Sequence, residues 1–254
     1  MKKLSKIALI LAVLALLTLA CGFPVNALKD NPPVIEKGSG NVIRSEPAIS
    51  EFTTLKLTGG GELRLVQGSE YSLVIEAEDN ILPHISTELS GSTLKLGYEE
   101  SLWKERYVPT KPIIYTVTFV NLEEITLIGG AKITCASLDV PQLRLDLNGG
   151  VDVTLNNLHA DKLTLKLDGG ANVSINGEVG EQSLTLNGAG AYSAEDLKSR
   201  AATLVINGAG EAKLWSTETL DITLNGFGSV SYYGSPQVTQ ALHGLGTITS
   251  LGDK

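Results

Sequence analysis

Few of the side chains that bind metals or form cross-links occur in this chain of 254 residues. It contains only two cysteines, and its three histidines lie far apart in sequence, at positions 84, 159 and 243. A protein metal site requires histidine, cysteine or carboxylate ligands that converge on one point. We therefore expect no metal ion, and nothing in the sequence indicates a cofactor.

Motifs for catalysis and for nucleic-acid binding are also missing. The chain has no Gly-x-Ser-x-Gly nucleophile elbow, no phosphate-binding loop and no run of four basic residues. Gly188-Ala-Gly190 resembles part of a dinucleotide-binding fingerprint, but no helix is expected to follow it. With 28 acidic residues against 20 basic ones, the chain is not expected to bind nucleic acid.

The N-terminus has the pattern of a bacterial lipoprotein signal. Three lysines among the first six residues precede an apolar run from Ile7 to Ala20, which is too short for a membrane span. The run ends in Leu-Thr-Leu-Ala-Cys21-Gly, which resembles the lipobox where signal peptidase II cleaves before a cysteine that then receives lipid. We predict removal of residues 1–20 as the signal peptide and lipidation of Cys21. Ordinary secretion and an uncleaved anchor helix are the alternatives.

Lipidation would hold the protein on the extracytoplasmic side of a bacterial membrane through the acyl chains of Cys21. The mature chain would carry 17 basic and 28 acidic residues, a net charge of −11. Cys135 would be its only thiol, so no intrachain disulfide is expected, and its place in an alternating run predicts a small buried side chain. Residues 21–46, with three prolines and a Gly-Ser-Gly segment, are expected to form a flexible tether, and residues 47–254 the folded domain.

A glycine motif recurs through the folded part. From Gly129 onward its spacing is 18 to 20 residues, and the residues two before and four after each anchor are apolar. Such a period is typical of a solenoid in which each repeat forms one turn, and the flanking alternation of apolar and polar residues indicates strands with one buried face. We predict an all-β, β-helix-like solenoid of short strands joined by glycine-rich turns, with helix only in the N-terminal segment and in a turn around Ser193–Lys198. The anchors are Gly59, Gly129, Gly149, Gly169, Gly188, Gly208, Gly226 and Gly244.

A polar column precedes these anchors. Stacked turns place equivalent residues roughly 4.8 Å apart, and Asn and Asp favour turns because they bond to nearby backbone. We predict a structural turn ladder, with a ligand-binding row as the alternative. Its members are Asn148, Asp168, Asn187, Asn207 and Asn225.

The order of these features resembles the putative auto-transporter adhesin, head GIN domain family over about residues 48–250. The resemblance is carried by Gly59–Gly61 with Leu63 and Leu65, by the Val74–Ile81 stretch, by Gly91–Leu96, and by the later Gly-Gly and Gly-Ala-Gly turns. It implies a β-helix-like domain on a secreted or lipid-anchored bacterial protein. It implies no catalytic residues.

The segment 98–112 interrupts the strand pattern and contains Trp103, Arg106 and Tyr107. Insertions in solenoids often loop out on the binding face. We predict these residues, with Trp215 and Tyr233 nearer the C-terminus, as contacts for a polysaccharide or a surface protein. The alternative is that Trp103 and Tyr107 cover the end of the coil. An uncapped last turn would also permit an oligomer through the solenoid end.

The expected function is non-catalytic, adhesin-like binding of an envelope polymer or protein. A purely structural or envelope-stress role is one alternative. The other is a carbohydrate-active β-helix enzyme, which would need carboxylates that converge on one strand face. Asp146, Asp152 and Asp168 with Lys166 come nearest to that arrangement, but they fall at outward positions where solvated charge is expected.

Overall fold

The computed structural model describes residues 36–98 and 107–254, which belong to one compact body that begins at Glu36. Apart from the short 3-10 helix η2 (Leu82–His84), the secondary structure of these residues is all β. The strands are β1 (Glu36–Lys37), β2 (Val42–Ser45), β3 (Thr54–Gln67), β4 (Ser72–Glu78), β5 (Ile85–Ser90), β6 (Thr93–Tyr98), β7 (Tyr107–Val108), β8 (Ile114–Phe119), β9 (Glu124–Cys135), β10 (Leu138–Asp139), β11 (Gln142–Leu186), β12 (Ala189–Ile206), β13 (Ala209–Leu224), β14 (Phe227–Tyr233), β15 (Gln237–Leu242) and β16 (Leu245–Ser250).

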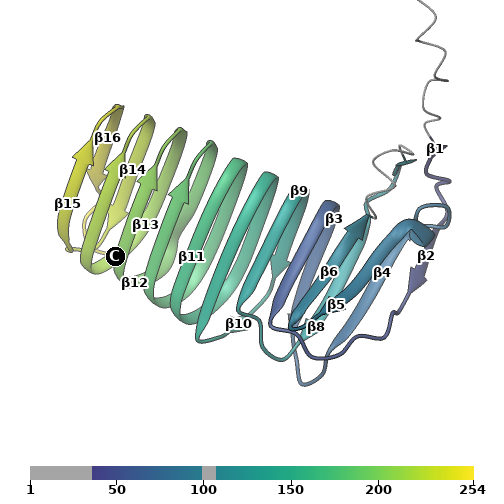
Figure 1. Cartoon of the computed structure of the whole chain (residues 1–254). Coiled ribbons are helices and arrows are strands. Elements are labelled where there is room, and N and C mark those ends of the chain that lie inside the picture. The colour runs from purple at the N-terminus through teal and green to yellow at the C-terminus, as the bar shows by residue number, and fades with distance from the viewer. Residues whose placement is uncertain (1–35, 99–106) are drawn as a thin grey trace, which may run out of the picture. The chain divides into compact units, whose positions relative to one another are not determined.

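The strands wind into a β-solenoid of about six turns, which confirms the predicted fold (Figure 1). In each turn one strand segment leads to the anchor glycine and a second leads away from it. We call these segments the first side and the second side. Successive turns are parallel and are in register around the anchor glycines, with Gly129 of β9 beside Gly149 of β11. The segment Ser193–Lys198, predicted as a helical turn, is instead part of β12. Ser193 and Lys198 pair with the turns on both sides, and the register of both ladders shifts between them, as in a β-bulge.

The anchor glycines form one column at the apex of the turns. A Cβ atom on any anchor from Gly129 to Gly244 would lie 1.8–2.3 Å from the carbonyl oxygen of the preceding anchor. The first four anchors also have φ between 107° and 140°, which residues with a side chain rarely adopt. The later anchors, from Gly188 onward, lie outside that range. Positive φ therefore favours glycine only in the first half of the column, whereas close stacking of the turns requires glycine from Gly129 to Gly244.

The inward columns of the turns form one hydrophobic core. The residues two before and four after the anchors are at most 2% exposed from the turn of Gly59 to the turn of Gly226. Each such leucine or valine contributes roughly 1.5–3 kcal/mol relative to an exposed position. Cys135 is buried among them, as predicted, and its burial raises the pKa of the thiol.

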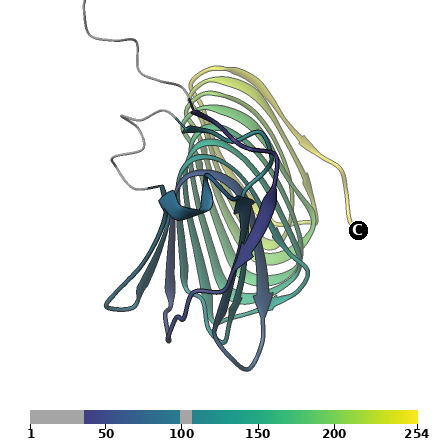
Figure 2. The same cartoon turned by 90° about the vertical axis from the view of Figure 1, so that its right-hand side faces the viewer.

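An antiparallel layer closes the core at the N-terminal end (Figure 2). β8 lies parallel to β3, β4 is antiparallel to β8, and β2 is antiparallel to β4. Phe52, Ile81, Tyr115 and Phe119 fill this end and have no exposed surface. The pairing of β2 starts at Val42, within the residues predicted as tether and upstream of the domain boundary expected at residue 47.

A buried carboxylate fastens this layer. Glu78 is 1% exposed and accepts hydrogen bonds from the backbone N–H groups of Gly40 (2.7 Å), Thr110 (2.8 Å) and Lys111 (3.3 Å), and from Thr110 Oγ1. Burial favours a higher pKa for Glu78, but the hydrogen bonds from Thr110, Gly40 and Lys111 outweigh it and hold the pKa below its ordinary value. We call Glu78 and its three partners the N-terminal clasp.

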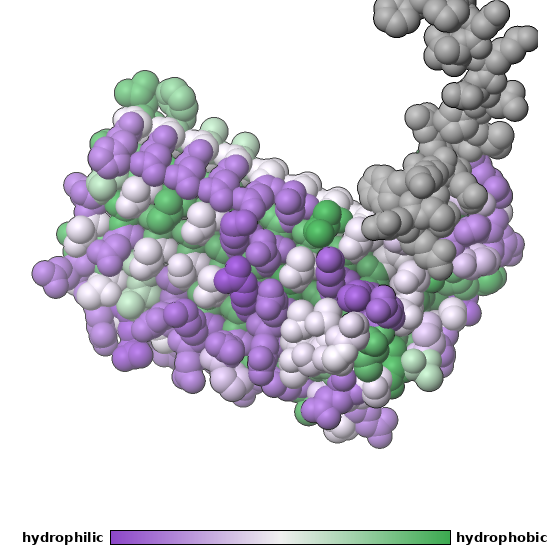
Figure 3. All heavy atoms as spheres, in the orientation of Figure 1, coloured by the Kyte–Doolittle hydropathy of each residue, from purple (hydrophilic) through white to green (hydrophobic). Residues whose placement is uncertain are grey.

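The C-terminal end is open by comparison. Among the described residues, β15 pairs only with β13 and β16 only with β14. Leu242 points inward but is 50% exposed, whereas Leu224, one turn before it, is fully buried. Phe227 is 64% exposed and Leu245 71%, and Figure 3 shows a hydrophobic knob above this end of the molecule.

Candidate functional site

The aromatic residues predicted to bind a ligand do not form one patch. Tyr107 lies in β7, where the centroid of its ring is 4.2 Å from that of His84. Trp103 and Arg106 lie outside the described residues. Trp215 and Tyr233 are side by side in β13 and β14. In the strand order of the sheet, β12, β11, β9 and β3 separate β13 from β8, near the other end. The prediction therefore divides into two separate places, and the second can be described.

Trp215 and Tyr233 form a C-terminal aromatic cluster with two lysines. Lys254 Nζ lies 5.7 Å from the ring centroid of Trp215 and 5.1 Å from that of Tyr233, and Lys198 Nζ lies 6.0 Å from Trp215. Lys254 is held there by Asp196 and by the carbonyl oxygen of Glu195 (2.7 Å). Both rings are half-buried, and the ammonium group of Lys254 lies over each of them.

A buried polar network lies behind this cluster. Tyr192 Oη donates to Gln182 Oε1 (2.7 Å), Gln182 Nε2 donates to Ser199 Oγ (2.8 Å), and Ser199 Oγ donates to the carbonyl oxygen of Trp215 (2.8 Å). Burial raises the pKa of Tyr192, so its hydroxyl stays protonated and remains a donor. The network fixes the backbone of Trp215. Sequence reasoning missed it, although Gln182 breaks a column that otherwise holds apolar residues, among them Ala202, Leu220 and Val238.

The polar column at the apex is connected by side-chain hydrogen bonds. Asn187 Nδ2 donates to Asp168 Oδ1 (2.6 Å), Asn207 Nδ2 to Asn187 Oδ1 (2.7 Å), and Asn225 Nδ2 to Asn207 Oδ1 (2.7 Å). Asn148 occupies the adjoining position in the same column and is exposed. The hydrogen bond from Lys166 Nζ (2.5 Å), followed by that from Asn187, lowers the pKa of Asp168. The amides of Asn187 and Asn207 each donate and accept within the column, which leaves each of them one N–H for a ligand.

The carboxylates considered for catalysis are each bound to a neighbour. Lys166 pairs with Asp168, Arg144 Nη2 lies 3.3 Å from Asp146, and Asn172 Nδ2 donates to Asp152 (2.9 Å). These groups stand on the outer surface. Within residues 36–98 and 107–254, no three His, Cys, Asp or Glu side chains are placed to share a metal ion.

A shallow groove crosses the first side near the base of the turns. Its volume is about 480 Å³, and it spans five stacked segments belonging to β3, β9 and three turns of β11. We call it the first-side groove. Arg144 bridges Glu124 (3.7 Å) and Asp146, while Lys162 pairs with Glu181 (3.9 Å). Its lining residues are Thr54, Glu123, Glu124, Gln142, Leu143, Arg144, Lys162, Thr164 and Ser183.

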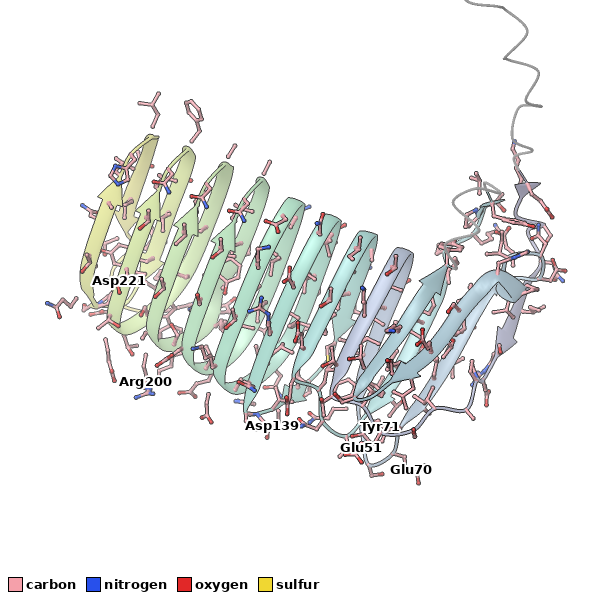
Figure 4. The ribbon with its side chains drawn as sticks, in the orientation of Figure 1. Glu51, Glu70, Tyr71, Asp139, Arg200 and Asp221 are labelled. Atoms are coloured by element: carbon pink, nitrogen blue, oxygen red, sulfur yellow. The ribbon has the colours of Figure 1, made fainter. Side chains whose placement is uncertain are left out.

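The groove follows an outward column that the sequence analysis did not single out. Thr54 pairs with Glu124 and Glu124 with Arg144, while Ser183 pairs with Thr203 and Thr203 with Asp221. Figure 4 labels Asp221, which continues the column toward the C-terminal end. The lining therefore offers hydroxyl, amide and charged groups of both signs along the solenoid axis, where a chain-like ligand would meet them one turn after another.

No helix in the described part of the chain is long and apolar enough to cross a membrane.

Comparison with known proteins identifies structures of the same fold and the family of the chain. No curated protein matches the chain. A putative adhesin from Bacteroides fragilis NCTC 9343 has a similar structure, with a TM-score of 0.78 and 24% identity over 85% of this chain and 99% of that one.

Two further solved structures share the fold. A putative lipid binding protein from Parabacteroides distasonis ATCC 8503 has a TM-score of 0.68 and 21% identity, over 86% of this chain and all of that one. A putative adhesin from Parabacteroides merdae ATCC 43184 has a TM-score of 0.63 and 20% identity, over 85% of this chain and 98% of that one. The family model described as putative auto-transporter adhesin, head GIN domain, matches residues 51–236, which is most of the solenoid. The chain therefore belongs to the putative auto-transporter adhesin, head GIN domain family.

Proposed function

We propose that this protein is a non-catalytic domain that is lipid-anchored outside the cytoplasm and binds an envelope polysaccharide through the first-side groove. The observation that carries the proposal is the direction of the groove, which crosses five stacked segments instead of following one strand. A linear polymer laid along the axis would meet equivalent side chains about every 4.8 Å. The family description and the names of two structural relatives, both putative adhesins, agree with a binding role.

The lining of the groove favours a neutral or zwitterionic polymer over a polyanion. Arg144 and Lys162 face Glu123 and Glu124 in the same groove, so its local charge is balanced. The remaining polar groups are hydroxyls and an amide, which donate and accept hydrogen bonds to sugar hydroxyls. The acidic excess of the whole chain would repel a polyanion at long range.

The two aromatic places are proposed as secondary contacts. Trp215 and Tyr233 offer ring faces next to Lys198 and Lys254. Tyr107, with Trp103 and Arg106 in the adjoining segment, stays a predicted contact at the other end. Because these places are far apart, a ligand that uses both would have to extend along the whole solenoid.

The experiment is a binding screen of protein comprising residues 22–254 against polysaccharides from bacterial envelopes. The groove variant is Arg144→Ala with Lys162→Ala, the aromatic variant is Trp215→Ala with Tyr233→Ala, and the charge-matched control is Lys132→Ala with Lys213→Ala on the second side. We expect the groove variant to lose binding at least tenfold, the aromatic variant to lose less, and the control to bind as the parent does. Loss in the control equal to that in the groove variant would refute the assignment to the groove.

Absence of any polysaccharide ligand would favour a protein ligand or a purely structural role. The non-catalytic part of the proposal has its own test, because a bound polymer should gain no new chain ends during prolonged incubation. Release of sugar that disappears in Asp146→Asn or Asp168→Asn would instead favour the enzyme alternative.

The lipid anchor rests on Cys21, which lies outside the described residues. We expect full-length protein to fractionate with membranes and to incorporate labelled fatty acid, and Cys21→Ser to do neither. Labelled fatty acid on the Cys21→Ser variant would contradict this anchor.

A further inference from the structure

The last part of the solenoid has the composition of a buried interface. No Asp, Glu, Lys or Arg occurs between Asp221 and Asp253, a stretch that contains β14, β15 and β16. The preceding turns carry ion pairs on their outer surface, among them Lys166–Asp168 and Lys198–Glu178. Exposed edge strands usually carry charge that prevents pairing with another chain, and the cores of interfaces are depleted of charge.

The same stretch leaves apolar side chains and strand edges uncovered. Leu242 is 50% exposed, Leu245 71% and Leu251 43%, and the outer edges of β15 and β16 have no partner among the described strands. Residues 252–254 do not cover them. Lys254 instead reaches back to Glu195 and Asp196, which precede it by 59 and 58 residues.

We propose that the C-terminal end binds a second copy of the same chain across a twofold axis, to form an end-to-end dimer. The proposal concerns assembly and does not depend on polymer binding. Gln240 in β15 and Ile248 in β16 are each four residues from Gly244, so they lie at the same level on the first and second sides. A single twofold axis can therefore pass through both strands at this level. It pairs β15 with β15 of the second copy and β16 with β16 of the second copy, and both pairs are antiparallel.

This register joins the exposed leucines. On the second side, Ile248 faces its own copy, Thr247 faces Thr249 of the other copy, and Leu245 faces Leu251. Leu251 is positioned for this, because its N–H donates to the carbonyl oxygen of Tyr232 (2.8 Å) and so continues the ladder of β16. Uncharged identical edges meet without repulsion in such an arrangement.

The first side gives a matching set of pairs. Val238 faces Leu242 of the other copy, and Gln240 faces its own copy. An amide can donate to and accept from an identical amide, so the inward-pointing glutamine at this open end would gain a partner. Gln240 and Thr239 are exposed in the single chain.

A head-to-tail stack fits the molecule less well. The edge strands at the N-terminal end, β2 and β5, are antiparallel to their neighbours and carry Arg44 and Glu88, whose charges would face an uncharged edge. The twofold arrangement needs only the open end and closes after two copies.

The test is sedimentation velocity of residues 22–254 over a wide concentration range, with two charge variants at exposed positions of β16. Thr247→Lys with Thr249→Lys places like charges opposite each other across the axis. Thr247→Lys with Thr249→Glu places opposite charges there. The control is Ser229→Lys with Ser231→Lys, the equivalent positions of β14, which is paired on both edges.

We expect the parent protein and the control to form a concentration-dependent dimer. The dissociation constant of the dimer should rise about tenfold or more in the Lys–Lys variant. The Lys–Glu variant should dimerise at least as tightly as the parent. Far-UV circular dichroism identifies any variant that fails to fold. A parent that stays monomeric, a series of higher oligomers, or equal loss in both variants of β16 would overturn the proposal. Binding of the monomer to phospholipid vesicles through Leu242 and Leu245 would overturn it as well.

Discussion

The two ends of the solenoid differ in how the terminal turn of the core is covered. At the N-terminal end, antiparallel strands and four fully buried large side chains close the core, and the N-terminal clasp holds the closing layer in place. At the C-terminal end the inward residues are partly exposed and the strand edges are bare. A stack of repeats with one common pattern thus has one end that excludes further strands and one end that can accept them.

The stacked turns between the two ends should be the most sensitive to substitution of an anchor glycine. Gly149→Ala places a Cβ atom 1.9 Å from the carbonyl oxygen of Gly129 at a φ of +136°, and we expect it to lower the free energy of unfolding by about 3 kcal/mol. Gly244→Ala meets Gly226 at the same distance, but the last turn can shift outward, so we expect a loss of about 1 kcal/mol. Urea unfolding measures both.

The control is Gly150→Ala, since a Cβ atom there meets no other atom within 4 Å. We expect a change within about 0.5 kcal/mol. Equal losses for Gly149→Ala and Gly244→Ala would show that the open end is as constrained as the interior, and the contrast between the regions would fail.

The closed end should depend on the N-terminal clasp. Glu78→Gln places an amide N–H₂ group against backbone N–H donors, so we expect the midpoint of thermal unfolding to fall by several degrees and β2 to exchange its amide hydrogens faster. Glu70→Gln is the control, because Glu70 is exposed at the base of the molecule (Figure 4). Unchanged exchange of β2 in Glu78→Gln would show that the clasp is not what holds this layer.

The same carboxylate predicts how the closed end responds to acid. The pKa of Glu78 is lowered in the folded state, so its contribution to stability is complete above the unfolded pKa of about 4.3 and is lost as the pH falls through the folded pKa. The difference in thermal midpoint between parent protein and Glu78→Gln should therefore be constant near neutral pH and shrink below about pH 4. A difference that grows in acid would contradict this sign.

The turn ladder at the apex should contribute less to the free energy of unfolding than the stacked glycines of the interior. Asn207→Ala removes one hydrogen bond to Asn187 and one from Asn225 on an exposed surface, and we expect a loss of about 1 kcal/mol in urea unfolding. Thr203→Ala, an exposed position in the same turn, is the matched control. A loss above that of Gly149→Ala would mean that the ladder, and not the stacked glycines, sets the register of the turns.

The regular part of the fold was predictable because each turn repeats the same physical requirements. The spacing of the glycines and the apolar columns determines the solenoid, and the burial of Cys135 follows from its place in such a column. The start of the body was not predictable in this way. Residues 36–46 have no periodicity, and Val42–Ser45 join the sheet only because β4 offers an antiparallel edge and Glu78 binds the backbone nearby.

The candidate sites were less accessible to sequence reasoning. Gln182 and Ser199 are 17 residues apart, and their hydrogen bond depends on how the bends between the two sides are folded. The first-side groove arises from the shapes of side chains in five stacked segments, which no single repeat contains. The absence of charge from residue 222 to residue 252 was visible in the sequence, but it gained meaning only once those residues formed the open end.

The most direct test of this difference between the ends is hydrogen exchange of residues 22–254 at low and high protein concentration, followed by mass spectrometry. We expect peptides covering β15 and β16 to exchange more slowly at high protein concentration, and peptides covering β2, β4 and β5 to exchange at the same rate at both concentrations. Equal exchange of β15 and β16 at both concentrations, or protection that appears at the N-terminal end instead, would contradict this expectation.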